Sequence, residues 1–136
     1  MLEDVNFLAV ALGAALAFGL GALWYSPVLF EKRWMAGHGH TQEMLKEMQA
    51  GMGPSYAIAF LCWLTMATVL AMIAPHFATG VGDTFHIGLM LWCGFSATVG
   101  LVHNRFSDKP ISVWVIDAGY ELTAIALMSI VIGLWS

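Results

Sequence analysis

Charged side chains are scarce in this sequence. Only 10% of the 136 residues are Asp, Glu, Lys or Arg, whereas 60% are hydrophobic. A water-soluble domain normally carries about 25% charged residues, so this chain lacks the polar surface that water requires. Five basic residues and a net charge of -4 are also the wrong balance for a nucleic-acid partner. We therefore expect the lipid bilayer to surround most of the chain.

Cysteine is almost as scarce, and recognisable enzyme motifs are missing. Cys62 and Cys93 lie inside apolar runs, which is not the pattern of a disulfide-stapled domain, and we interpret them as buried apolar side chains. No nucleophile elbow, phosphate loop, zincin motif or dinucleotide fingerprint occurs. The acidic start Met1–Asp4 lacks the positive charge of a signal peptide, so we expect the first apolar run to be a retained transmembrane helix.

Four long apolar runs dominate what is present. Each approaches the ~20 residues that an α-helix needs to cross a bilayer, and backbone groups in lipid must bond within their own helix. We therefore predict an all-α integral membrane protein, a bundle of four transmembrane helices forming one membrane domain over residues 1–136. The predicted helices cover residues 5–25, 53–74, 85–102 and 111–135. Turn residues that we expect to separate them occur at Ser26-Pro27, at Pro75, and over 79–83 and 108–110.

Only the connection between the first two predicted helices is long. Within it, Met44, Leu45, Met48 and Met52 fall on one helical face, and Gly51 is a suitable helix end. This spacing predicts a short amphipathic helix at the membrane surface over residues 41–50. A mobile polar loop is the alternative.

The basic residues predict an orientation. All five lie in the first and third connections, at Lys32, Arg33, Lys46, Arg105 and Lys109. Positively charged loops remain on the cytoplasmic side of a membrane. We therefore expect the 1–2 and 3–4 loops to be cytoplasmic and the N- and C-termini to lie outside.

Two carboxylates in the fourth apolar run are the strongest candidates for a site. Asp117 and Glu121 are four residues apart, so they share one helix face. At ~1.5 Å per residue from Ile111, Asp117 lies about 9 Å and Glu121 about 15 Å into the helix. Acids at this depth are unfavourable by about 2.5–3.5 kcal/mol on insertion scales, so both should face the bundle interior.

Other polar residues are expected at a similar depth. In an antiparallel bundle they form one candidate cluster with the two acids: Tyr25, His103, Asn104, Arg105, Asp117, Tyr120 and Glu121. Arg105 is the expected counter-ion of Asp117, with His103 as a second candidate. The cluster is interpreted either as a proton, ion or ligand site or as a structural network that fixes helix register.

Small residues recur along the first predicted helix. Ala9, Gly13, Ala17 and Gly21 form one row at four-residue spacing, and Ala11, Ala15 and Gly19 form another. Such rows let helices approach closely. We expect the first row to be a helix-packing face, either within the monomer or between copies.

Metal and cofactor signals are weak. His38 and His40, with the methionines that follow them, are the only candidates for a soft metal such as Cu(I). Met is also common on apolar faces, so we predict no metal. Haem would need histidines that face each other in the bundle, and only His103 is suitably placed, so we predict no cofactor.

Two stretches resemble a known family. The first is Gly21–Met35, which includes Leu-Trp-Tyr-Ser-Pro, and the second is Ile116–Leu122, which includes Ala-Gly-Tyr. Together they resemble the domain-of-unknown-function family 1761, small and mainly bacterial membrane proteins. The resemblance implies four helices in a bacterial cytoplasmic membrane and supplies no activity. In the family pattern Asn commonly stands at the position of Asp117 and His at that of Glu121.

Three functions are compatible with these features. We favour an oligomerising or accessory subunit of a membrane complex, which fits the small size, the short loops and the small-residue rows, and keep the other two as alternatives. A small proton-coupled transporter or channel fits the intramembrane acids, although no helix is clearly broken in mid-span. A membrane enzyme on a lipid-like substrate would use Asp117 or Glu121 as acid or base, but no nucleophile accompanies them, and we favour a protein that is not an enzyme.

Overall fold

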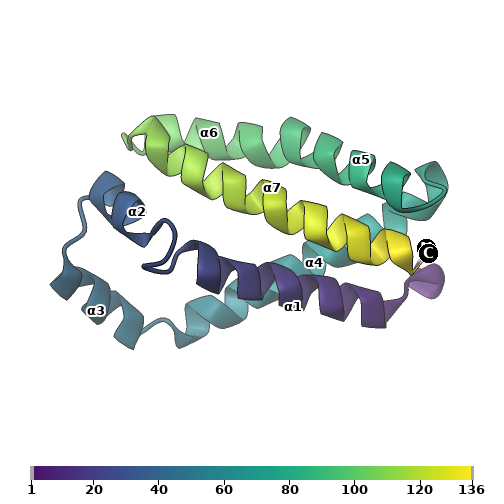
Figure 1. The fold of residues 1–136 in the computed structure, drawn as a ribbon, viewed down its shortest axis with the longest axis horizontal. Helices are drawn as coiled ribbons and strands as arrows, with labels where there is room; N and C mark the ends of the chain where they lie inside the picture. The colour runs from purple at the N-terminus through teal and green to yellow at the C-terminus, as the bar shows by residue number, and fades with distance from the viewer. Residues whose placement is uncertain (1, 136) are drawn as a thin grey trace.

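The structure is a computed structural model that describes residues 2–135, and every regular element over these residues is a helix, with no strand (Figure 1). A short 3-10 turn, Leu2–Asp4, precedes the first helix. The helices are α1 (Phe7–Trp24), α2 (Glu31–His38), α3 (Gln42–Ala50), α4 (Gly53–Phe77), α5 (Val81–Leu91), α6 (Ala97–Phe106) and α7 (Ile111–Leu134). A π-helical turn, Trp92–Ser96, joins α5 to α6 without a break.

Four of these helical stretches are long and apolar enough to cross a membrane. They are Phe7–Trp24, Gly53–Phe77, Val81–Phe106 and Ile111–Leu134. The prediction of four such helices is therefore confirmed, and their ends agree with it to within a few residues.

Three predicted helix ends fall three or four residues short: the second helix continues past residue 74 to Phe77, and the third begins at Val81 instead of residue 85 and continues past residue 102 to Phe106. Pro75 lies inside α4, which continues to Phe77: proline lacks only the N–H that would bond the carbonyl of Ala71, and the last turn is still closed by the hydrogen bond from the N–H of Ala78 to the carbonyl of Ala74. Residues 81–83 were expected in a loop but form the first turn of α5. Asp83 fits there because its carboxylate accepts hydrogen bonds from the backbone N–H and the hydroxyl of Thr79.

The first connection contains two short helices where one was expected. Residues 42–50 form α3 as predicted, and none of its residues is buried. The additional helix, α2, was missed because its charged start gives no apolar periodicity. It ends at Gly39, which adopts the left-handed conformation (φ 72°) that favours glycine.

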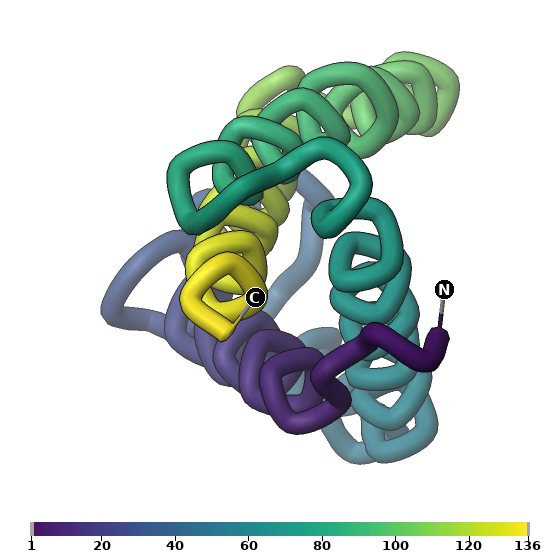
Figure 2. The backbone as a smooth tube through the Cα atoms, turned by 90° about the vertical axis from the view of Figure 1, so that its right-hand side faces the viewer, coloured from purple at the N-terminus to yellow at the C-terminus, as the bar shows by residue number. Residues whose placement is uncertain are grey.

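α7 is the central helix. It packs against α1 and α5 along much of its length and against α6 and α2 near its N-terminal end, whereas α4 packs mainly on α1. The start of α1 and the end of α7 lie at the same end of the molecule (Figures 1 and 2). The first connection and the α6–α7 connection lie at the other end (Figure 1), so all five basic residues are on elements at that end.

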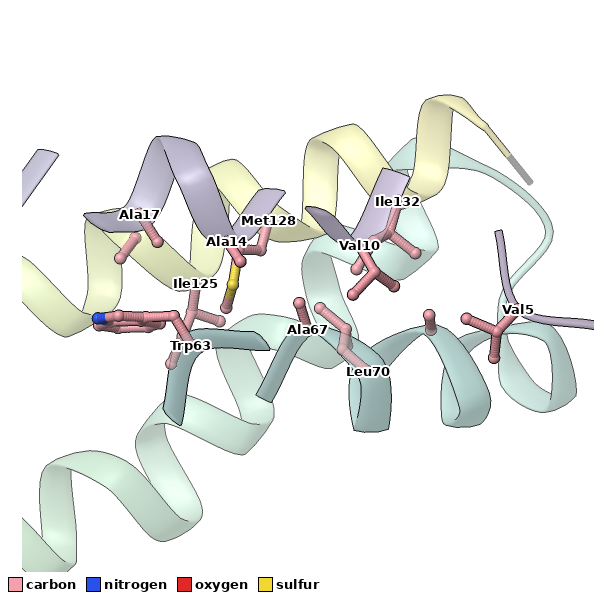
Figure 3. Packing of buried hydrophobic residues seen from close by; sticks show 12 residues of the cluster. Val5, Val10, Ala14, Ala17, Trp63, Ala67, Leu70, Ile125, Met128 and Ile132 are labelled. Carbon is pink, nitrogen blue, oxygen red and sulfur yellow. The ribbon is translucent and has the colours of Figure 1, made fainter. Parts of the chain in front are cut away.

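The core lies between α1, α4 and α7 and combines small and branched side chains with Trp63 and Met128. Ala14 and Ala17 of α1 are fully buried in this core, as is Ala67 of α4 (Figure 3). Ala124 of α7 is also fully buried. The row Ala9, Gly13, Ala17 and Gly21 faces this interior, and a Cβ at Gly13 would lie 3.5 Å from Met128. Small residues therefore allow α1 to approach α7 closely within one chain.

α5 and α7 also approach closely, at Gly88 and Ser129. A Cβ at Gly88 would overlap the Ser129 hydroxyl, which is buried and donates to the carbonyl of Ile125. We expect Gly88→Ala to lower the free energy of unfolding by about 1–3 kcal/mol, as overpacking does in other cores. Denaturant titration in detergent micelles, followed by tryptophan fluorescence, measures this change.

Two controls distinguish overpacking from a general effect of the substitution. Gly19→Ala adds the same methyl group where no atom lies within 4 Å, so it should not destabilise the protein. Adding Ser129→Ala to Gly88→Ala should restore part of the loss, because it removes the overlapping oxygen. Equal losses for Gly88→Ala and Gly19→Ala would contradict the α5–α7 packing.

Candidate functional site

Asp117 is held by two donors from distant parts of the chain. Its Oδ1 accepts hydrogen bonds from the Tyr25 hydroxyl (2.5 Å) and from the indole Nε1 of Trp34 (3.1 Å). Tyr25 directly follows α1, and Trp34 lies in α2. The carboxylate therefore ties α2 and the end of α1 to α7.

Tyr25 is well suited to this donor role. Burial, the hydrogen bond to Asp117 and the negative charge of Asp117 together raise the pKa of the Tyr25 hydroxyl far above its ordinary value. The hydroxyl therefore keeps its proton at physiological pH and can donate it to the carboxylate.

α2 lies against α7 through its apolar side. Met35 is buried, and a Cβ at Gly37 would overlap the Val113 side chain. The Trp34 ring contacts those of Tyr25, His38 and His40, with centroids 5.8, 4.1 and 5.8 Å away. This packing explains how a helix with a polar sequence acquires a fixed position beside Asp117.

Glu121 has a single partner, which the π-helical turn supplies. Its Oε2 accepts a hydrogen bond from Ser96 Oγ (2.7 Å). No hydrogen bond from the described residues reaches Glu121 Oε1 or Asp117 Oδ2. Each carboxylate therefore keeps one oxygen that can bind something else.

A cavity of about 220 Å³ lies beside both carboxylates, between α6 and α7. Ser107 and Lys109 of the α6–α7 connection line one end, and Glu121, three helical turns further along α7, lines the other. Liquid water occupies about 30 Å³ per molecule, so this volume is enough for a small organic molecule or several waters. The remaining lining residues are His38, Gly100, His103, Asn104, Val113, Trp114, Asp117 and Ala118.

Two cavity residues carry buried polar atoms that no described residue satisfies. Asn104 donates through Nδ2 to the carbonyl of Pro110 (3.0 Å), but its Oδ1 is buried without a partner. His38 Nε2 is in the same situation. Burial, followed by the charge of Lys109 and by His40, lowers the pKa of His38, so its imidazole is neutral at physiological pH.

The expected polar cluster is brought together in part. Tyr25 contacts Asp117, and His103, Asn104, Asp117 and Glu121 share the cavity. The Tyr120 ring contacts that of Tyr25, with centroids 5.5 Å apart, but its hydroxyl donates to the carbonyl of Ala17 in α1 (2.7 Å) and lies outside the cavity lining.

Arg105, the expected counter-ion of Asp117, is exposed. No ion pair among residues 2–135 joins Arg105 or His103 to Asp117. Successive helical residues point about 100° apart, so burial of Asn104 against α7 turns Arg105 away. The neutral donors Tyr25 and Trp34 replace the expected charge.

A set of tryptophans around the acids was not predicted from the sequence. Trp24 donates from its indole to the carbonyl of Ile116 (2.9 Å), and Trp92 donates to that of Ala118 (2.9 Å). Trp114 donates to the carbonyl of Ala97 (3.0 Å). The feature that could have identified them is the number of tryptophans, six in 136 residues. The indole N–H of a buried tryptophan usually has a hydrogen-bond partner.

The remaining candidate groups are the histidine pair and the two cysteines. His38 and His40 rings are 5.3 Å apart, and no group of three metal-binding side chains occurs in the described part of the chain. Cys62 and Cys93 were expected to be buried but are exposed on the outer faces of their helices, which are apolar as well. An apolar environment suits a thiol on either face.

The Tyr25–Asp117 hydrogen bond can be tested by a double-mutant cycle. Because hydrogen bonds to charged groups contribute about 1.5–3 kcal/mol, Tyr25→Phe should lower the free energy of unfolding by that order. Tyr56→Phe, which removes an exposed hydroxyl, should have little effect. In an Asp117→Ala background the effect of Tyr25→Phe should disappear, and an unchanged effect there would mean that the bond does not stabilise the fold.

The fold and the site together define a class: a small helical protein with four membrane-length helices and a cavity that two carboxylates line. The chain belongs to the family described as "Protein of unknown function (DUF1761)", whose model matches residues 8–133. The family resemblance found in the sequence is thereby confirmed. Neither a curated protein nor a solved structure matches the chain.

Proposed function

We propose that the chain is an integral protein of the bacterial cytoplasmic membrane, which its four long helices cross. The first connection and the α6–α7 connection face the cytoplasm, and both termini face outward. The length and apolar character of the four helices support this arrangement. So does the gathering of all five basic residues on elements at one end of the molecule.

α3 fits the cytoplasmic membrane surface in this arrangement. Its Met44 and Met48 are exposed, and none of its residues is buried against the rest of the chain. An amphipathic helix with a free apolar side lies stably at a lipid headgroup boundary.

Within this membrane we propose a small transporter or channel that conducts protons by itself, with Glu121 as the group that carries the proton. The observation that supports it is a carboxylate about 15 Å along a spanning helix, in contact with a cavity and with one oxygen unbonded. A purely structural acid would be paired on all sides, since a free buried charge is unfavourable. Asp117, with two donors on one oxygen, fits the complementary task of fixing the site.

Proton flux tests this proposal. In liposomes that enclose a pH-sensitive dye, an imposed pH gradient should collapse faster with the protein than without it. Glu121→Gln should reduce that flux roughly tenfold or more, because an amide cannot carry the proton. Glu43→Gln, the same change on the exposed helix α3, should leave it unaltered. Flux equal to that of empty liposomes, or equal flux in both variants, would refute proton transport through Glu121.

A second candidate function, an oligomerising or accessory subunit, rests on the other small-residue row. Ala11, Ala15 and Gly19 are exposed on α1, and nothing lies within 4 Å of a Cβ at Gly19. This row offers a second copy a surface for close helix contact.

Energy transfer between labelled copies in lipid tests the association. Ala15→Leu should weaken it, because the larger side chain separates the helix backbones. Ala57→Leu, on an exposed face of α4, should not. If the unmodified protein gave no energy transfer above background at any protein-to-lipid ratio, self-association would be excluded.

A further inference from the structure

We propose that α2 is a pH-sensitive cover over one end of the cavity, and that protonation of His38 releases it. His38 lines the cavity from α2, at the end where Ser107 and Lys109 of the α6–α7 connection also line it. The effect of this release on proton conduction rests on the proposed function, whereas the release itself depends only on the contacts that α2 makes.

α2 is held against α7 by few contacts. Met35 is its only buried residue, and Gly37 packs closely against Val113 of α7. The indole of Trp34 adds one polar tie, its hydrogen bond to Asp117. A helix with so little buried surface opens locally at a low free energy, so a single added charge is enough to shift its position.

The docked position of α2 offers no acceptor for a proton on His38 Nε2. This nitrogen is buried, and it forms no hydrogen bond with any of residues 2–135. A neutral imidazole can keep a lone pair on this nitrogen, whereas an imidazolium carries an N–H on both ring nitrogens. A buried N–H without an acceptor is unfavourable, so the docked helix selects the neutral form of His38.

Groups outside α2 decide how docking changes the proton affinity of His38. The rings of Trp34 and His40 lie 4.1 and 5.3 Å from that of His38, but both belong to the same segment. They move with His38, so they act on it about equally in the docked and released positions. The charged or titratable groups that face it from the elements packed around α2 are Lys109 of the connection, His103 of α6, Asp117 of α7, and Tyr25 after α1.

Burial and Lys109 outweigh Asp117 in this setting. Burial lowers the pKa of His38 most, followed by the positive charge of Lys109 and by His40, whereas Asp117 raises it by less than any of these lowers it. Asp117 Oδ1 already accepts hydrogen bonds from Tyr25 and Trp34. His38 therefore binds a proton more weakly when α2 is docked than when α2 is released.

The direction of the pH dependence follows from this difference. An exposed histidine has a pKa of about 6.5, and docking lowers the pKa of His38 below that value. Docking of α2 is therefore fully favourable above about pH 6.5 and weakens as the pH falls below it. One proton lowers the docking equilibrium constant by at most about tenfold per pH unit in this range.

A distance between two spin labels measures the position of α2. Ala36→Cys on α2 and Phe95→Cys in the π-helical turn place the labels at exposed positions, and Cys62→Ala and Cys93→Ala remove the native thiols, which are also exposed. In phosphatidylcholine nanodiscs we expect one narrow distance distribution at about pH 8. A second, broader population should grow between about pH 6.5 and about pH 5.

Two outcomes of this measurement would overturn the proposal. One is the absence of a second population down to about pH 5. The other is a distribution that becomes narrower at low pH, because Asp117 would then bind the imidazolium and hold α2 more firmly.

Variants assign the response to His38. His38→Gln cannot take up a proton, so its distances should not change with pH, whereas His86→Gln, at an exposed position of α5, should keep the full response. Lys109→Gln should reduce the response, because loss of this charge brings the docked pKa of His38 closer to that of an exposed histidine. Lys46→Gln on the exposed face of α3 should not reduce it. A full response in His38→Gln would assign the proton to another group and refute the proposal.

The two proposals fail in different ways. Proton flux with α2 in one position at every pH would refute the pH-sensitive cover and leave proton conduction intact. Movement of α2 with pH in a protein without proton flux would refute conduction through Glu121 and leave the cover.

Discussion

A carboxylate placed inside an apolar helix must be given hydrogen-bond donors, and this requirement organises one end of the molecule. Asp117 receives its donors from Tyr25 and Trp34, which lie in elements far from α7 in the sequence. Removing either donor leaves a buried charge undersatisfied, which is more unfavourable than never having made the bond. Asp117 therefore adds two polar ties, to α2 and to the end of α1, to the apolar packing of Met35 and Gly37 against α7.

Glu121, one turn further along the same helix, has fewer hydrogen-bond donors than Asp117. It has one donor, Ser96, and a cavity instead of a second protein partner. Indole donors around this region satisfy the carbonyls of Ile116 and Ala118, so the neighbouring backbone is fixed while the Glu121 side chain keeps an open side. A rigid backbone that carries an incompletely paired charge is the arrangement that a binding site requires.

The sequence predicts the parts of this structure that depend on hydropathy and spacing. Four apolar runs define the long helices, and the four-residue interval between Asp117 and Glu121 places both on one face. The sequence could not predict Trp34 as a partner of Asp117 or Ser96 as the partner of Glu121. α2 becomes a helix in its observed position through contacts with α7, and Ser96 reaches Glu121 from a π-helical turn, which no apolar periodicity signals.

That π-helical turn also explains why α5 packs closely on α7 whereas α6, in the same helical span, leaves a cavity beside it. One extra residue in the turn rotates all later side chains by about 100° relative to a continuous α-helix. Before it, Gly88 brings α5 into close contact with Ser129. After it, α6 packs less extensively on α7, and Gly100 and Asn104 line the cavity. The change in register between Trp92 and Ser96 therefore turns the span from a face packed on α7 to a face that lines the cavity.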